Sequence, residues 1–274
     1  MHFPKFWALG SCPTGKFRCW RWSDSSQADA QSAADEAATE LAAKAAADKF
    51  PRGGYGYPDR PMREEIIRDV APGTVISRNG VGCLILKTEK VMFVDIDIIG
   101  LEEAPAQLSF FGRLFGNKTR QETIGPVVEN VRTIANSDSS WGWRIYATRA
   151  GLRLIATHAP FSATAEVTKQ TFEKLDADPL YRRLCEAQES FRARLTPKPW
   201  RCNHGPAPVR WPFPSDLEKS RFDRWEKDYL KFAAEFATCS YLGSEGNETI
   251  HPEIKPIVDL HDELTLANSE LELA

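Results

Sequence analysis

Val-Met-Phe-Val-Asp-Ile-Asp-Ile, residues 91–98, places two carboxylates inside a dense apolar run. Such a run predicts a buried β-strand. Residues two apart on a strand point to the same face, so Asp95 and Asp97 would lie side by side with like charges. Neighbouring buried carboxylates need a neutralising cation, and a hard cation such as Mg²⁺ or Mn²⁺ is the usual solution. The alternative is that the strand ends near Asp95 and that both acids face solvent or cap a turn.

The segments around this run alternate between strand and helix patterns. The expected elements are, in chain order, a strand at 82–88 that forms a hairpin with 91–98, a helix at 122–136, strands at 143–148 and 152–157, helices at about 164–175 and 178–191, and a closing strand at 192–196. From residue 91 onward the order is strand, helix, strand, strand, helix, strand. This order predicts an α+β fold with an RRM-like (ferredoxin-like) palm, in which helices cover an antiparallel sheet.

The 274 residues suit one large domain or two small ones. Residues 1–50 predict a small ββα unit, because two Trp-rich strands precede a Ser-capped, Ala-rich helix. Residues 51–81 begin with many Gly, Pro and Tyr residues and are expected to be a linker. The palm would then span 82–201, and 202–274 would form a helical C-terminal extension that ends in a solvated acidic tail.

The composition is that of an ordinary globular chain, with 42% hydrophobic and 27% charged residues. A net charge of −3 argues against a strongly basic nucleic-acid clamp, although a local basic patch is compatible with it. The chain shows no signal peptide and no apolar run near 18 residues, so we expect no membrane association. Its six cysteines are therefore expected to be reduced thiols in a cytoplasmic protein.

Three motifs resemble those of the archaeo-eukaryotic primase and primase–polymerase superfamily. They are Phe-Val-Asp-Ile-Asp at 93–97, Thr-Arg-Ala-Gly-Leu-Arg-Leu at 148–154, and Phe-Arg-Ala-Arg-Leu-Thr-Pro-Lys at 191–198. The resemblance covers about residues 82–201. It implies a DNA-replication function as a metal-dependent nucleotidyltransferase, in which carboxylate-held Mg²⁺ or Mn²⁺ ions activate a 3′-hydroxyl and neutralise a nucleoside triphosphate. The implied partners are that triphosphate and nucleic acid.

The resemblance also implies roles for individual residues. Asp95 and Asp97 would be catalytic metal ligands, with Asp178 as the third acid. Asp176 is the alternative to Asp178, and either acid could instead cap the following helix. Arg153 stands where the family has a nucleotide-binding His, and the nearest His is His158, which would contact the substrate; at a strand end it could equally be structural. The expected phosphate-binding cations are Arg153, Arg192, Arg194 and Lys198.

Two other functions use the same residues. A non-catalytic RRM-like module would present its arginines and tryptophans to nucleic acid or to a protein. A metal-dependent phosphoesterase would use the two acids to activate water. Metal binding separates the two enzymes from the module, and nucleotide incorporation separates the transferase from the phosphoesterase.

Overall fold

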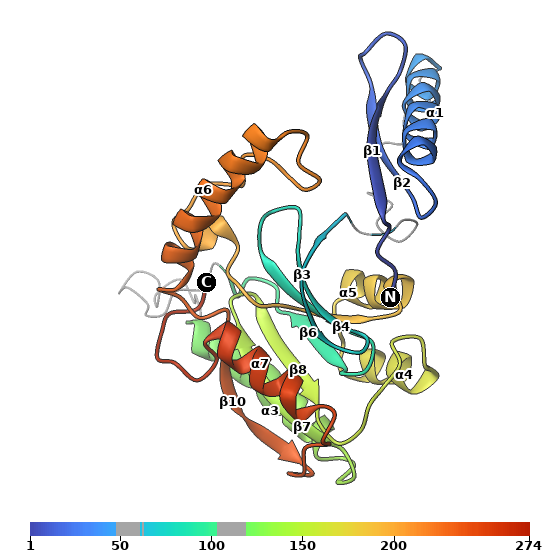
Figure 1. Cartoon of the computed structure of the whole chain (residues 1–274). Helices are drawn as coiled ribbons and strands as arrows, with labels where there is room; N and C mark the ends of the chain where they lie inside the picture. The colour runs from blue at the N-terminus through green and yellow to red at the C-terminus, as the bar shows by residue number, and fades with distance from the viewer. Residues whose placement is uncertain (48–60, 62, 103–118) are drawn as a thin grey trace. The chain divides into compact units, whose positions relative to one another are not determined.

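The computed structural model describes residues 1–47, 61, 63–102 and 119–274. It divides into a small unit, His2–Arg63, and a larger unit, Glu64–Ala274 together with Met1. Figure 1 shows the helices and strands of both units. None of the described helices is long and apolar enough to cross a lipid bilayer.

The small unit has the strand–strand–helix order expected for residues 1–50, in its described part. β1 (Phe6–Ser11) and β2 (Arg18–Ser23) form an antiparallel hairpin, and α1 (Gln27–Ala46) packs against both strands. The Ser26 side chain caps the helix by accepting a hydrogen bond from the Asp29 backbone N–H at 3.0 Å. The buried helix residues are all alanines, which allows the close approach of helix and hairpin.

The larger unit contains a four-stranded antiparallel sheet in the order β10–β7–β8–β6, the central sheet. Its strands are β6 (Phe93–Asp97), β7 (Gly142–Thr148), β8 (Gly151–Ala156) and β10 (Cys239–Gly246). The three strands predicted around the two acids and the Arg-Ala-Gly turn therefore share one sheet, and the α+β class with antiparallel pairing is confirmed.

Helices cover both faces of the central sheet. In Figure 1, α7 (Lys255–Thr265) lies on its near side and α3 (Arg120–Ala135) on its far side. The predicted helical spacing of α3 is confirmed, because Ile124, Val128 and Val131 are buried in the main core. Every residue of β8 is buried as a result. The acid strand is thus held against a strand that has almost no solvent contact.

A second antiparallel sheet has the order β3–β4–β5–β9. Its strands are β3 (Glu65–Ala71), β4 (Thr74–Arg78), β5 (Leu84–Thr88) and β9 (Phe191–Arg194). The predicted hairpin between 82–88 and 91–98 is wrong, because β5 and β6 lie in different sheets. The expected linker is also partly wrong, since its residues 65–71 and 74–78 are strands. The predicted closing strand exists as β9, but it pairs with β5 and not with β6.

A buried ionic network holds β9 on β5. Lys87 and Arg192 are opposite each other in the register, and both contact the Glu64 carboxylate, at 3.1 Å and 2.8 Å. Burial opposes the charge of Glu64, but Arg192 and Lys87 outweigh it and lower the pKa of this carboxyl to about 2. Two like charges facing each other across a ladder are tolerated because both contact the same buried carboxylate.

The remaining helices connect and cover these sheets. They are α4 (Glu166–Lys174), α5 (Pro179–Gln188), the short 3₁₀ helix η1 (Pro199–Arg201) and α6 (Asp216–Ala233). The helical C-terminal extension expected for 202–274 contains α6, which is capped by Ser215. Residues 202–274 are more than a helical extension, however, because they supply edge strand β10 and helix α7 of the central sheet. All six cysteines are free thiols.

The acidic end of the chain is not simply solvated. Asp262 on α7 accepts hydrogen bonds from Arg144 at 2.5 Å and from the Tyr146 hydroxyl at 2.7 Å. Its neighbour His261 is fully buried, and burial lowers the pKa of this imidazole to about 4. α7 is therefore docked by polar contacts as well as by its apolar residues Ile257 and Val258.

Gly151 provides a test of how closely β8 approaches β6. A Cβ atom at this position would overlap the carbonyl oxygen of Ile96. Gly151→Ala should therefore lower the free energy of unfolding by about 1–3 kcal/mol or more, as overpacking does. Urea denaturation measures this change. Gly205→Ala is the matched control, since nothing lies within 4 Å of its Cβ position; equal stability of the two variants would contradict the close approach.

Candidate functional site

A polar cavity of about 150 Å³ opens where the acid strand β6, the β7–β8 turn and the exit of β9 come together. We call it the Asp95 cavity. Its lining residues are Asp95, Asp97, Glu102, Thr148, Arg149, Ala150, Leu152, Arg153, Arg194, Lys198, Arg201 and Thr238. The three sequence motifs quoted above each contribute to this lining. Five cations and three carboxylates surround one small space.

Asp95 and Arg153 form the inner wall of the cavity. The two residues are opposite each other in the β6–β8 register, so their side chains share a face. Arg153 Nε donates to Asp95 Oδ1 at 2.8 Å, and Nη2 donates to Oδ2 at 3.0 Å. This is a bidentate pair, the strongest arrangement of these two groups. Burial disfavours the charge of Arg153, yet the Asp95 carboxylate raises the pKa of its guanidinium.

The same guanidinium also connects the two sheets. Arg153 Nη1 donates to the backbone carbonyl of Arg194 on β9 at 3.0 Å. The Tyr181 hydroxyl, from α5, lies within hydrogen-bond distance of the carbonyls of Phe93 on β6 and Arg192 on β9. β6 and β9 thus lie close together without a direct ladder between them. Arg153 and Tyr181 fill the gap that separates them.

Asp97 lies at the mouth of the cavity and is more accessible than Asp95. No described residue forms a hydrogen bond or an ion pair with its carboxylate. Burial, and then the nearby carboxylates of Asp178 and Asp95, raise the pKa of Asp97. Two acids on one face with a raised pKa at one of them agree with the expectation for the Asp-X-Asp strand.

Asp178 is near Asp97 but does not line the cavity. Its side chain caps α5 by accepting a hydrogen bond from the Tyr181 backbone N–H at 2.6 Å, and its own N–H donates to the Asp95 carbonyl at 2.9 Å. The helix-cap alternative for this acid is therefore the one observed. The cap uses Oδ1 alone, so it is compatible with a metal contact through Oδ2.

The opposite wall is cationic. No carboxylate of the described residues lies within ion-pair distance of Arg194 or Lys198, whereas Arg201 pairs with Glu102. Burial lowers the pKa of both Arg194 and Lys198, and Arg194 adds to the effect on its neighbour. Two desolvated cations without a partner carboxylate are unfavourable on their own and form a site that attracts an anion.

The described carboxylates around the cavity do not gather into a three-ligand group. Among the described residues, no group of three His, Cys, Asp or Glu side chains converges closely enough to hold a metal ion. Both oxygens of Asp95 are already bonded to Arg153. Among the acids that line the cavity, Asp97 is the one whose carboxylate has no hydrogen-bond or ion-pair partner in the described residues. One such carboxylate fits a Mg²⁺ ion that arrives with substrate phosphates, since such ions need just one or two protein carboxylates.

Two predicted site residues lie elsewhere. Arg192 does not face the cavity, because its guanidinium bonds to Glu64 within the second sheet. His158 follows the far end of β8 from Arg153. Its Nδ1 accepts a hydrogen bond from the Gly142 N–H at 3.2 Å, and its ring packs against Trp141. Burial lowers the pKa of His158, which favours the neutral imidazole, and this residue does not line the Asp95 cavity.

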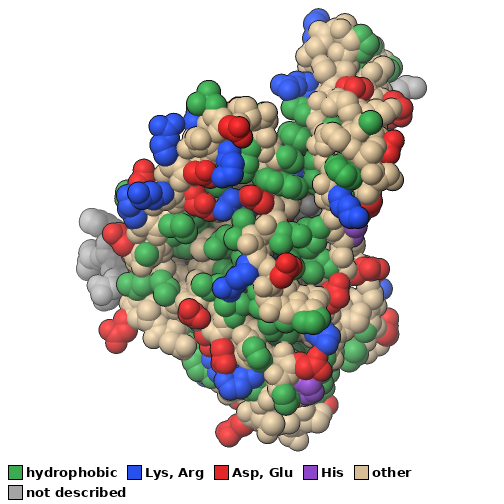
Figure 2. Space-filling view, in the orientation of Figure 1, with side chains coloured by type: hydrophobic (Ala, Val, Ile, Leu, Met, Phe, Trp, Pro, Cys, Tyr) green, Lys and Arg blue, Asp and Glu red, His purple; other side chains and the backbone are tan. Residues whose placement is uncertain are grey.

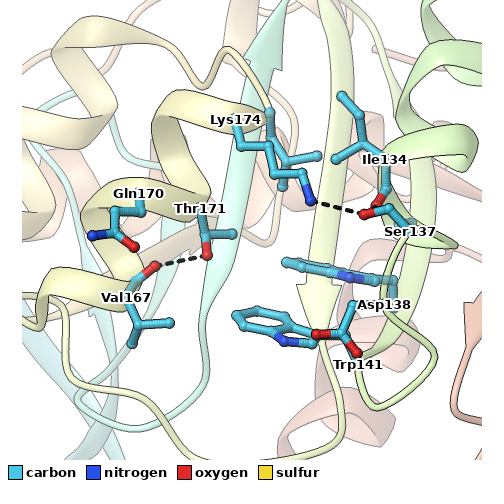
Figure 3. A pocket seen from close by; sticks show the side chains of 11 residues that line it. Ile134, Ser137, Asp138, Trp141, Val167, Gln170, Thr171 and Lys174 are labelled. Carbon is cyan, nitrogen blue, oxygen red and sulfur yellow. Dashed lines mark hydrogen bonds between the residues drawn. The ribbon is translucent and has the colours of Figure 1, made fainter.

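A second cavity, of about 200 Å³, lies between α3 and α4 (Figure 3). The stacked rings of Trp141 and Trp143 and the side chains of Ile134, Val167 and Leu175 make it mostly apolar. Its one cation, Lys174, donates to Ser137 at 2.8 Å. This cavity is larger than the Asp95 cavity but offers no convergent charges, so it is a weaker candidate for binding a charged ligand.

Sequence reasoning missed several contributors to the Asp95 cavity. Arg149 belongs to the turn before Gly151, and Glu102 and Thr238 come from segments with no motif. Of these three residues, only Arg149 lies within one of the three motifs, the one at 148–154, and so could have been indicated by the sequence. On the face shown in Figure 2, basic and acidic side chains are intermixed, so that face has no broad basic patch that could bind an anion in place of the Asp95 cavity.

Comparison of the chain with protein-family models, curated proteins and solved structures found no match.

Replacing Asp95 should destabilise the protein strongly. Asp95→Ala removes the counter-ion of a guanidinium that is only 3% exposed, and breaking such a buried pair costs roughly 3–5 kcal/mol. Chemical denaturation at neutral pH measures the loss. A variant as stable as the wild type would show that Arg153 does not depend on this carboxylate.

Asp97→Asn is the contrasting variant. A carboxyl whose folded-state pKa is raised destabilises the folded state as pH rises from the ordinary Asp pKa through the raised value. The Asn variant should thus be more stable than the wild type at neutral pH, by a few tenths of a kcal/mol because solvent screens the repulsion. The difference should vanish in acid, where Asp97 is protonated in both states. Thermal unfolding over a pH series tests this, and a less stable Asn variant at neutral pH would contradict it.

Proposed function

We propose that this chain binds the phosphates of a nucleoside triphosphate in the Asp95 cavity, as a degenerate relative of the primase-like nucleotidyltransferases. The observation that carries the proposal is the convergence of Arg194 and Lys198, both without a partner carboxylate among the described residues, on a cavity that also contains Asp97. Cations of this kind recognise phosphate through charge-assisted hydrogen bonds. Phosphate binding would remove the unfavourable burial of two unneutralised charges.

The order of the elements supports the palm-like part of the proposal. The order β6, α3, β7, β8, α4, α5, β9 is that of an RRM-like palm with two helices in place of its second one, and it has the two acids on the first strand and the Gly-bearing turn between the second and third. β9 lies near β6 but pairs with β5 in the second sheet. The cations of its exit, Arg194 and Lys198, still reach the cavity where the resemblance expects phosphates.

Both oxygens of Asp95 are bonded to Arg153, which favours ligand binding over catalysis at this site. Two-metal transfer needs carboxylates that can share two ions. With Asp95 held by Arg153, Asp97 is the one acid of the Asp-X-Asp pair that can contact the Mg²⁺ or Mn²⁺ carried by the triphosphate. A two-metal transfer that uses both acids would require Arg153 to release Asp95.

Calorimetric titration with Mg²⁺-ATP tests the proposal. The wild type should bind, and Arg194→Ala and Lys198→Ala should each weaken binding by about 1.5–3 kcal/mol, the energy of a charge-assisted hydrogen bond. Arg183→Ala is the matched control, because this cation is exposed on α5 and outside the cavity. Loss of binding only in the cavity variants supports the site.

Three further results would change this conclusion. No binding of any nucleotide by the wild type would overturn the proposal. Incorporation of a labelled nucleotide into a primer–template, abolished by Asp97→Asn, would show an active transferase in place of the degenerate relative. Release of inorganic phosphate or pyrophosphate without incorporation would point to the phosphoesterase.

A further inference from the structure

One exposed aromatic residue lies beside the Asp95 cavity. Trp200 belongs to η1, between Lys198 at the start of this helix and Arg201 at its end, and both of these neighbours line the cavity. Its side chain is 57% exposed, whereas Trp7 and Trp143 are buried in the cores of their units. A single exposed apolar residue is ordinary on a protein surface, so what distinguishes Trp200 is its place between two residues that line a cationic cavity.

Hydrogen bonds from α6 and from Cys83 hold the backbone of the segment that carries Trp200. The Tyr229 hydroxyl donates to the carbonyl of Pro197 at 2.6 Å, and the Cys83 thiol donates to the same carbonyl at 3.2 Å. Pro199 is buried. The indole therefore stands on an anchored backbone and not on an unattached loop, so its position is set before any ligand arrives.

Lys198 links the indole to the cavity. Its ammonium lies 5.6 Å from the centre of the Trp200 ring, a cation–π distance, and the same side chain lines the cavity. A phosphate that contacts Lys198 would bring the rest of its molecule to the indole. The exposed part of the ring is free to take a planar group.

The size of the cavity indicates what that group is. At about 150 Å³ it is well below the roughly 300–1,000 Å³ that hold a whole drug-sized ligand. It can enclose phosphates but not an entire nucleotide, so the base must lie outside, on the rim. Among the described residues that line the cavity or directly adjoin a lining residue in the chain, Trp200 is the exposed aromatic residue.

We infer that Trp200 stacks on the nucleobase of the nucleotide whose phosphates occupy the Asp95 cavity, an inference that rests on the proposed function. The ligand chemistry is a nucleobase joined through its sugar to phosphate, either free or as the end of a strand. Stacking accepts every base because each has a π-face, and it favours purines because their overlap with an indole is larger. Purine nucleotides should therefore bind more tightly than pyrimidine nucleotides.

The test compares ligands with and without a base. Mg²⁺-ATP, Mg²⁺-UTP, inorganic tripolyphosphate and a 5′-phosphorylated oligonucleotide are titrated into the wild type, Trp200→Ala and Trp200→Phe. Trp200→Ala should weaken ATP binding by about 5- to 150-fold, the range of base–aromatic stacking, and leave tripolyphosphate binding unchanged. Trp200→Phe should retain most of the affinity. Leu217→Ala, which removes another exposed apolar side chain, should change nothing.

The outcomes distinguish this inference from the function beneath it. If ATP and tripolyphosphate bind the wild type equally and Trp200→Ala binds both as well, the stacking inference is overturned while the phosphate site stands. If neither ligand binds, both are overturned. An effect of Trp200→Ala on the oligonucleotide alone supports stacking and assigns the base to a strand. Thermal unfolding of each variant verifies that the fold is intact.

Discussion

The guanidinium of Arg153 is the group on which the site depends. It is almost completely buried, pairs with both oxygens of Asp95 on β6, and bonds to the Arg194 carbonyl on β9. A buried charge of this kind is tolerated only when its hydrogen bonds are complete, so each of these contacts is needed. The pair therefore fixes the acid strand, its neighbour β8 and the exit of β9 relative to one another. The cavity exists because those three segments are held in this way.

The same arrangement explains the uneven roles of the two acids. Both carboxylate oxygens of Asp95 accept hydrogen bonds from Arg153, so this acid has a structural role. Asp97, two residues along the same face, keeps its carboxylate uncommitted at the mouth of the cavity, with a raised pKa from burial and from neighbouring carboxylates. Residues that are unfavourable for stability in this way are typical of binding and catalytic sites. Arg194 and Lys198 belong to the same class, since burial lowers the pKa of each.

Sequence reasoning found the elements of the site better than their connections. The strands at β6, β7 and β8 and the helix α3 were predictable because each has its own apolar period and its own turn signals. The pairing of β9 was not, because it depends on Glu64, 128 residues earlier in the chain, which neutralises Arg192 opposite Lys87. A strand pattern predicts that a segment is extended, but it does not predict which other strand pairs with that segment. For the same reason the hairpin expected between β5 and β6 was wrong.

The amino-acid sequence by itself determined that Asp95 and Asp97 share a face of a buried strand, since side chains alternate along any strand. It also determined that Arg153 follows the Gly-bearing turn and that Arg194 and Lys198 lie close together near the end of a basic strand. Only the tertiary structure decided that Arg153 neutralises Asp95, that Arg192 turns away to Glu64, and that His158 packs against Trp141. Ion pairs and burial depend on which strands become neighbours, and that is set by the packing of the whole unit and not by any local pattern.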